Sequence, residues 1–175
     1  MRNNDASVFF EPSSETGANK LRIVTSPGAA GRCVWAGLPL ALGEEVLTFG
    51  GERYTHDQLS DFTHCLEIAP GVYLGPSGEA DDYVNHSCHP NCHVAVVEDH
   101  FVLRANAAIA AGDEITFDYS TVMWNDPTSF VCKCGWPNCR GVIRSFPYLP
   151  ERTKARYIAL GFVPFLSIGS LTLPR

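Results

Sequence analysis

The chain has 175 residues, the size of one domain, and its 45% hydrophobic content is enough to enclose one apolar core. With 13 Lys and Arg against 19 Asp and Glu, its formal net charge of -6 excludes the basic surface that direct nucleic-acid binding requires, and a basic or polar protein segment is a better partner. The sequence shows neither a membrane-spanning apolar run nor a signal-peptide pattern, so we expect a soluble, intracellular protein without membrane contact.

The first segment, residues 1–20, mixes Asn, Ser, Glu, Gly and Pro, and we expect it to be a loose N-terminal arm. Beyond it, short apolar runs alternate with Gly, Pro and Asp, a pattern typical of strands joined by tight turns. The expected strands are residues 21–25, 32–36, 45–49, 66–69, 72–74, 93–97, 100–105 and 115–117. These runs predict a mainly β fold.

Two segments have a helical pattern. Residues 55–65 begin with Thr55 in an N-cap position and Gln58 three residues later, the sequence of a capping box. Residues 150–160 begin with Pro150, which a helix accepts in its first turn. We therefore expect a few short helices beside the strands.

Three cysteines crowd the segment CKCGWPNC, at Cys132, Cys134 and Cys139. In a reducing compartment such crowding indicates a metal site rather than disulfides, and thiolates at this spacing suit tetrahedral zinc, which needs one further ligand. Cys88 and Cys92 are the candidates for it, and Cys88 is favoured because it lies in the polar cluster NHSCHPN, residues 85–91.

The remaining cysteines, Cys33 and Cys65, stand alone in apolar runs and are interpreted as packed core thiols. Singly, the polar residues of 85–91 are also explained as residues that brace a loop. Their combination in one segment favours a binding site.

Residues 85–91, NHSCHPN, and residues 112–119, GDEITFDY, resemble in order and spacing the two signature motifs of SET domains, and the pattern CxCxxxxC of the post-SET segment follows. The resemblance covers about residues 21–143. It implies a SET-domain fold of small curved β-sheets, in which the NHSC segment threads under a loop near the second motif to form a pseudoknot. The implied division is a SET domain at 21–127, a zinc-binding post-SET segment at 128–145 and a C-terminal extension at 146–175.

The function implied by this resemblance is that of an S-adenosylmethionine (SAM)-dependent protein-lysine N-methyltransferase acting on an exposed tail, of a histone or another protein. Tyr119 corresponds to the catalytic tyrosine, Asn85 to the residue that holds the amino-acid portion of SAM, and His86 to the residue that fixes the adenine through its main chain. The full implied cofactor site is Gly31, Arg32, Cys33, Asn85, His86, Tyr119, Val142 and Ile143, and the implied zinc ligands are Cys88, Cys132, Cys134 and Cys139.

Three positions depart from the family pattern. Cys33 replaces the second glycine of Gly-x-Gly, Phe49 replaces the tyrosine of Tyr-x-Gly-Glu, and Val94 stands where a second substrate-pocket tyrosine is expected. An apolar pocket with one hydroxyl is compatible with repeated methylation, a changed substrate or lost activity. Two alternatives therefore stay open, a non-catalytic SET binding module and a SET-fold enzyme that acts on a small molecule.

The extension 146–175 carries several aromatic residues. Such a tail packs over its own domain or over a partner, and self-association as a homodimer is one form of the second arrangement.

Overall fold

The computed structural model describes residues 20–25, 31–124 and 129–164. The predicted arm, apart from Lys20, and residues 165–175 of the extension lie outside the described residues. The strands are β1 (Leu21–Thr25), β2 (Arg32–Ala36), β3 (Glu45–Thr48), β4 (Arg53–Thr55), β5 (Leu66–Ala69), β6 (Val72–Leu74), β7 (Asn85–His86), β8 (Cys92–Val97), β9 (His100–Ala105), β10 (Thr116–Phe117), β11 (Phe130–Val131) and β12 (Val142–Ile143). The helices are α1 (Glu151–Ala159) and the 3-10 turns η1 (His56–Gln58), η2 (Ala80–Tyr83), η3 (Tyr119–Val122) and η4 (Phe146–Tyr148).

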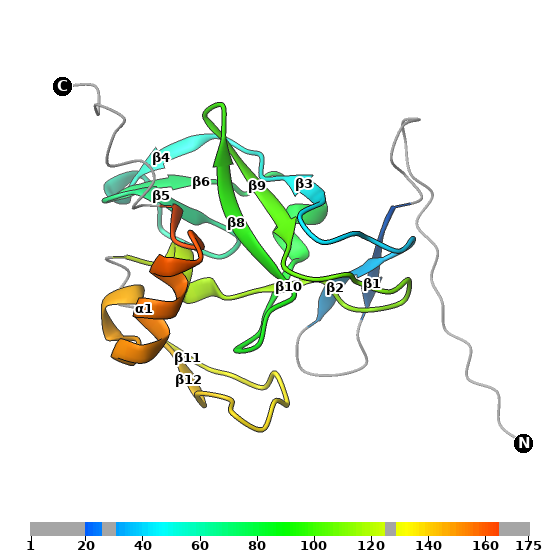
Figure 1. Ribbon diagram of the computed structural model, residues 1–175. Coiled ribbons are helices and arrows are strands. Elements are labelled where there is room, and N and C mark those ends of the chain that lie inside the picture. The colour runs from blue at the N-terminus through cyan, green and yellow to red at the C-terminus, as the bar shows by residue number, and fades with distance from the viewer. Residues whose placement is uncertain (1–19, 26–30, 125–128, 165–175) are drawn as a thin grey trace, which may run out of the picture.

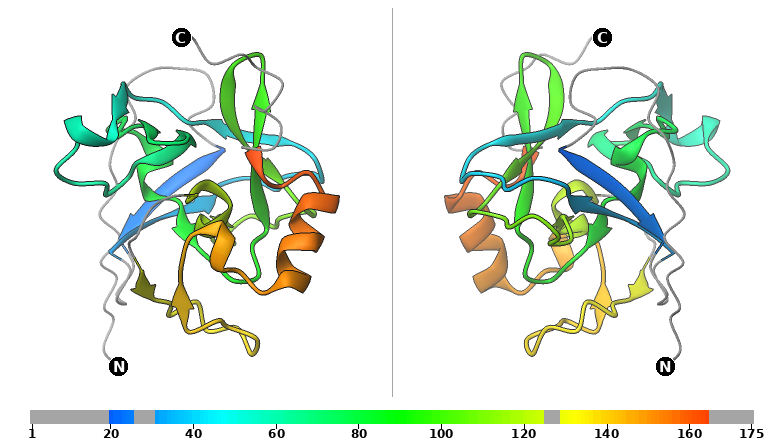
Figure 2. Two further views of the ribbon diagram at one scale, coloured as in Figure 1. Left: turned by 90° about the vertical axis from the view of Figure 1, so that its left-hand side faces the viewer. Right: turned by 90° about the vertical axis from the view of Figure 1, so that its right-hand side faces the viewer.

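Small sheets build the described part of the chain. The antiparallel sheet β3-β9-β8 lies at the centre, between the sheet β4-β6-β5 and the hairpin β1-β2 (Figure 1). Two shorter pairs complete the set, β10 with β7 in parallel and β11 with β12 antiparallel. The segment that carries β11 and β12 projects from the lower end of the molecule, below α1 (Figure 2).

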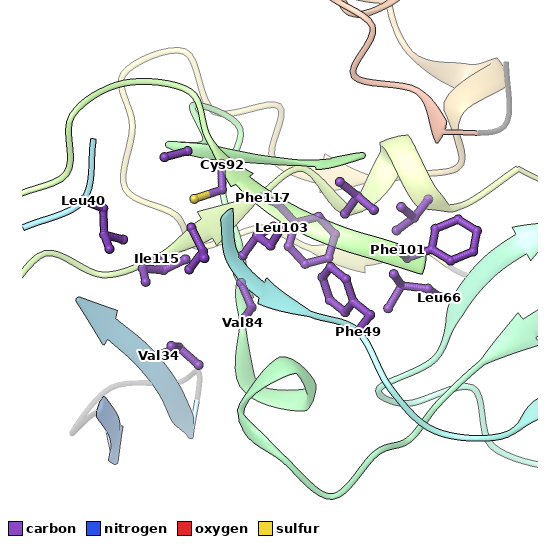
Figure 3. Packing of buried hydrophobic residues seen from close by; sticks show 14 of the residues in the cluster. Val34, Leu40, Phe49, Leu66, Val84, Cys92, Phe101, Leu103, Ile115 and Phe117 are labelled. Atoms are coloured by element: carbon purple, nitrogen blue, oxygen red, sulfur yellow. The ribbon is translucent and has the colours of Figure 1, made fainter. Parts of the chain in front are cut away.

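The main core lies where these sheets meet. Alternate residues of β8 and most of β9 face it, so that Val94 and Leu103 are fully buried. The rings of Phe49 and Phe117 meet edge to face with centroids 5.8 Å apart, and Figure 3 shows them beside Leu103 and Val84. Burying each such side chain contributes about 1.5–3 kcal/mol, so this contact stabilises the junction between β3 and the second motif.

A second, smaller cluster attaches the C-terminal segment. Its buried side chains are Phe146, Leu149, Tyr157 and Val163. The ring of Trp124 stacks on Phe146 at 5.4 Å, and the ring of Phe162 stacks on His93 of β8 at 4.1 Å. Through these contacts the described part of the extension packs on the domain itself.

The sequence predicted the strands better than the helices. Five strands, at 21–25, 32–36, 66–69, 72–74 and 100–105, have the expected bounds, and the other three differ by one residue at one end. The helix predicted at 150–160 is confirmed as α1, with Pro150 in the N-cap position rather than in the first turn.

The helix predicted at 55–65 is wrong, because only the 3-10 turn η1 forms there. The capping box does form, since the Thr55 N–H donates to Gln58 Oε1 at 2.8 Å. The chain then leaves the helical region at Leu59, and Asp61 Oδ1 accepts the Thr63 N–H at 2.9 Å. This local side-chain bond offers the backbone an alternative to the helix.

The turn between β3 and β4 depends on Gly51. Its φ is +104°, and a Cβ atom there would lie 2.6 Å from the Cα of Gly75. We expect Gly51→Ala to lower the free energy of unfolding by more than the roughly 1–3 kcal/mol of backbone strain alone, because a main-chain contact must also open. Denaturant unfolding measures this. Gly71→Ala, whose Cβ would meet nothing within 4 Å, is the control, and an equal effect of the two variants would contradict the close approach.

The described helices include none that is both long and apolar enough to cross a bilayer.

Candidate active site and metal centre

The two signature motifs lie side by side as the parallel pair β7 and β10. Asn85 is in register with Thr116 and His86 with Phe117, and the Ser87 N–H donates to Phe117 O at 3.1 Å. The adjacency that the resemblance implied is therefore present.

His86 connects this pair to the residues around it. The Tyr119 N–H donates to His86 Nδ1 at 3.2 Å, which leaves the imidazole proton on Nε2, 3.4 Å from Cys88 Sγ. Burial lowers the pKa of His86 to about 4, and the Asp118 carboxylate at 3.5 Å offsets only part of this shift. The ring is therefore neutral near neutral pH, and its contact with Asp118 is not an ion pair.

Tyr119 is the residue that the resemblance assigns to catalysis. Its hydroxyl donates to Val84 O at 2.8 Å, and its ring packs against Phe117 and Phe130 at centroid distances of 4.9 and 5.9 Å. Burial raises the pKa of the phenol well above its usual range, so it stays protonated at neutral pH. The oxygen keeps lone-pair capacity for a further donor.

A pocket of about 540 Å³ opens beside Tyr119. Its inner wall is mainly apolar and is made by Phe49, Val84, Phe117, Tyr119, Val122, Met123 and Phe130. Its other wall is the segment 60–66, with Asp81 and Asp82. Of the two predicted substrate residues, Phe49 lines this pocket, whereas Val94 lies in the core of β8 and does not.

Three of the predicted cofactor residues lie close together, Gly31 and Arg32 at the start of β2 and Asn85 in β7. The Asn85 amide donates to Arg32 O at 3.4 Å and to Glu114 Oε1 at 2.9 Å. The guanidinium of Arg32 lies 3.6 Å from the centroid of the Tyr83 ring and donates to the Tyr83 hydroxyl. Gly31 precedes this cluster with a φ of 71°.

Three other predicted cofactor residues differ in what they can offer. The Cys33 side chain is buried, its thiol donating to Val24 O, so Cys33 could reach a cofactor only through its main chain. In β12 the Ile143 side chain is fully buried, whereas Val142 is 44% exposed. Val142 is therefore the better placed of the pair to cover a ligand.

The four predicted metal ligands come together. The sulfur atoms of Cys88, Cys132, Cys134 and Cys139 all lie within 4.8 Å of one another, and those of Cys88 and Cys132 are 3.7 Å apart. With zinc–sulfur bonds of about 2.3 Å, sulfurs at tetrahedral corners would lie about 3.8 Å apart. Cys92 is buried in β8 outside this cluster. The donor set therefore fits zinc, with Cys88 as the fourth ligand.

Main-chain donors and burial act in opposite directions on the thiolate form that a metal requires. Main-chain N–H groups of Arg140 and Gly141 donate to the sulfurs of Cys88 and Cys139, each at 3.4 Å. Burial raises the pKa of Cys88 to about 11, and the Arg140 N–H offsets only part of this shift. A bound cation reverses this balance by favouring the thiolates.

We expect the purified chain to hold about one equivalent of zinc and Cys88→Ser to lose most of it, because a serine hydroxyl is a poor replacement for a thiolate ligand. Metal analysis after brief dialysis against chelator measures this. Cys92→Ala is the matched variant that should retain zinc. Loss of zinc from Cys92→Ala alone would contradict the ligand set.

Asp118 is a buried residue that the sequence did not single out. Its carboxylate pairs with Arg140 through Nη1 to Oδ2 at 2.6 Å and Nη2 to Oδ1 at 2.7 Å, and it accepts the Tyr157 hydroxyl at 2.8 Å. Burial opposes the charge on Arg140, but the bonds to Asp118 outweigh it and raise the pKa of the guanidinium. Asp118 lies in the sequence FDY of the second motif, and Arg140 lies in the sequence CRG after the cysteines. Because the two residues are far apart in the chain, no local sequence pattern predicts that they form an ion pair.

These features together define a small β domain with two paired signature motifs, a buried tyrosine at an apolar pocket and a four-cysteine cluster suited to zinc. A sequence profile described as SET domain matches residues 11–120. The chain belongs to the SET-domain family.

Similar sequences in other proteins support this membership. The chain is 34% identical over 122 residues to the histone-lysine N-methyltransferase ash1 of Drosophila melanogaster, and 27% identical over 134 residues to ATX2 of Arabidopsis thaliana. These matches cover 61% and 66% of this chain but only 6% and 12% of the relatives. The chain thus spans a small part of the length of these methyltransferases.

Solved structures share the fold. SUVH6 of Arabidopsis thaliana in complex with SAM superposes with a TM-score of 0.61 at 19% identity, covering 71% of this chain and 33% of that one. KRYPTONITE in complex with mCHH DNA, an H3(1-15) peptide and SAH superposes with a TM-score of 0.58 at 22% identity, covering 71% and 29%.

Proposed function

We propose that this protein is a SAM-dependent protein-lysine N-methyltransferase with Tyr119 as its catalytic residue. The observation that carries the proposal is the Tyr119 hydroxyl, held by Val84 O in the apolar wall of the pocket and next to the paired motifs. The names of the relatives, which are histone-lysine N-methyltransferases, support the same reaction.

The pocket suits the acceptor amine. A free lysine has a pKa near about 10.4, and only its neutral form has the lone pair that attacks a methyl group. Phe49, Phe117 and Phe130 disfavour the ammonium form and so lower the pKa of an inserted lysine, whereas the carboxylates Asp61, Asp81 and Asp82 of the same pocket act in the opposite direction. We propose that the apolar side chains, together with the positive sulfonium of SAM when it is bound, outweigh these carboxylates, so that water can carry the proton away without a dedicated base.

Tyr119 then aligns the amine. Its proton is engaged by Val84 O, so its oxygen can accept an N–H of the amine and orient the nitrogen lone pair. SAM, when bound, supplies the electrophilic methyl group. Because the phenol stays protonated, its hydroxyl keeps donating to Val84 O, and its oxygen stays free to accept from the amine, as the pH rises toward the range in which lysine loses its proton.

We further propose the main chain of 31–33, Asn85, His86 and Val142 as the SAM-binding elements. Asn85 already bridges the β2 and β7 sides of the site through Arg32 O and Glu114. The zinc-bound segment 132–139 leads directly into β12, so it would hold Val142 beside the cofactor.

The proposed substrate is an exposed, basic protein segment, such as a histone tail. The pocket wall carries three carboxylates, Asp61, Asp81 and Asp82, whose charge favours a cationic chain. KRYPTONITE was solved with an H3(1-15) peptide. An intracellular location, the absence of direct nucleic-acid binding and self-association stay predictions.

A non-catalytic binding module is the second candidate, and one observation favours it. Phe49 occupies the pocket with a side chain that cannot donate a hydrogen bond to the amine, so the pocket offers one hydroxyl fewer than the family pattern. A pocket that binds without turning over would have this composition.

One experiment separates these candidates. The full chain is incubated with methyl-labelled SAM and either core histones or a small-molecule cell extract, and the products are separated from unreacted SAM. Label in the histone fraction supports the methyltransferase, and label in a small molecule other than SAM indicates an enzyme redirected to another substrate. Measured SAM binding without any labelled product would instead favour the binding module.

A further inference from the structure

The buried carboxylate of Asp118 joins three parts of the chain that lie far apart in sequence. Asp118 itself directly precedes Tyr119 in the second motif. Arg140 follows the last cysteine of the zinc cluster, and Tyr157 lies in α1 of the extension. All three side chains are largely or fully buried, so no water competes strongly for these bonds.

On one side, this carboxylate holds the predicted zinc-binding segment, residues 128–145, called the zinc segment below. The two parallel bonds from Arg140 fix the guanidinium plane, and Nη2 also donates to Ser120 Oγ at 3.2 Å. The main-chain N–H of the same arginine donates to Cys88 Sγ. Arg140 therefore connects the metal ligands directly to the turn that carries the catalytic tyrosine.

On the other side, α1 supplies the third donor. The Tyr157 hydroxyl donates to Asp118 Oδ2, the same oxygen that accepts Arg140 Nη1. Its ring is fixed in the second cluster between Phe146, Leu149 and Val163. A buried ion pair depends on such additional hydrogen bonds, because they satisfy the lone pairs that the partner charge leaves open.

We infer that Tyr157 is a positioning residue, which acts through Asp118 and Arg140 to hold the zinc segment over the catalytic site. The part that concerns catalysis rests on the proposed function, while the part that concerns the metal segment does not. The C-terminal extension, through Tyr157, thereby helps to shape the proposed active site.

Tyr157→Phe tests this inference because it removes the hydroxyl and keeps the ring that packs the cluster. We expect the zinc of the variant to pass to excess chelator about tenfold faster than that of the wild type, from the loss of one hydrogen bond to a charged group. The KM for SAM should rise while kcat stays near its wild-type value. Tyr148→Phe, at a tyrosine that is 70% exposed, is the matched control and should change neither quantity.

A cycle with Arg140→Lys separates positioning from general loss of structure. Lysine keeps the charge but cannot form the two parallel bonds, so it should also speed zinc release. If Tyr157 acts through this pair, its effect must shrink in the Arg140→Lys background. Wild-type zinc release from Tyr157→Phe, or two effects that simply multiply, would overturn the inference.

Zinc release needs no methyl transfer, so the two proposals fail separately. If the wild-type chain showed no transferase activity, the proposed function would be wrong. The zinc release rates would still decide whether Tyr157 positions the zinc segment.

Discussion

Tyr119→Phe is expected to lower the single-turnover rate of methyl transfer by about a hundredfold or more and to leave SAM binding nearly unchanged. The variant keeps the ring between Phe117 and Phe130 and loses the hydroxyl that we propose orients the amine. Rapid-quench transfer of labelled methyl measures the rate, and calorimetric titration measures binding.

Tyr54→Phe is the matched control, because it removes a hydroxyl from β4, outside the pocket. It should retain the wild-type rate. A Tyr119→Phe rate within a few-fold of wild type would mean that positioning by this hydroxyl is not the source of catalysis.

The second large effect is expected from Asp118→Asn, which leaves the Arg140 guanidinium in its partly buried site without a counter-charge. Removing one partner of a buried ion pair typically costs about 3–5 kcal/mol, and the partial exposure of Arg140 places this case toward the lower figure. Denaturant unfolding in zinc-saturated buffer measures the change.

Asp99→Asn is the control for this substitution. Asp99 lies in the turn between β8 and β9 with a φ of 67°, a conformation that asparagine accepts readily. Its free energy of unfolding should stay within about 0.5 kcal/mol of wild type. An equally small loss in Asp118→Asn would show that the ion pair does not stabilise the fold.

Eight of the described strands were predictable because each is a short apolar run, and the turn residues on either side mark where it begins and ends. The pattern failed at 55–65, where a capping box is followed by a side-chain turn at Asp61 instead of further helical bonds. It also missed four short strands, β4, β7, β11 and β12. In the last pair Val131 and Val142 are exposed, so no alternation of buried apolar residues marks it.

The site was predictable as far as its motifs reach. The motifs predicted the four cysteines as metal ligands and Tyr119 as the catalytic residue, and the structure places the cysteines together and Tyr119 in the lining of the pocket. Val94 was assigned to the pocket by alignment with the family, but its position in β8 points its side chain into the core. Asp118, Arg140 and Tyr157 are far apart in the chain and meet only in the folded protein, so no local sequence pattern predicts their contact.

The most direct test of the account is to locate the methyl group on the product. An H3-tail peptide is incubated with the full chain and SAM, and fragment mass spectra assign any added methyl groups to individual residues. The account predicts methylation of a lysine side-chain nitrogen, its loss when that lysine is replaced by arginine, and strong reduction with Tyr119→Phe. Persistent absence of methyl-lysine, in the peptide and in whole histones, from a zinc-loaded chain that binds SAM would contradict it.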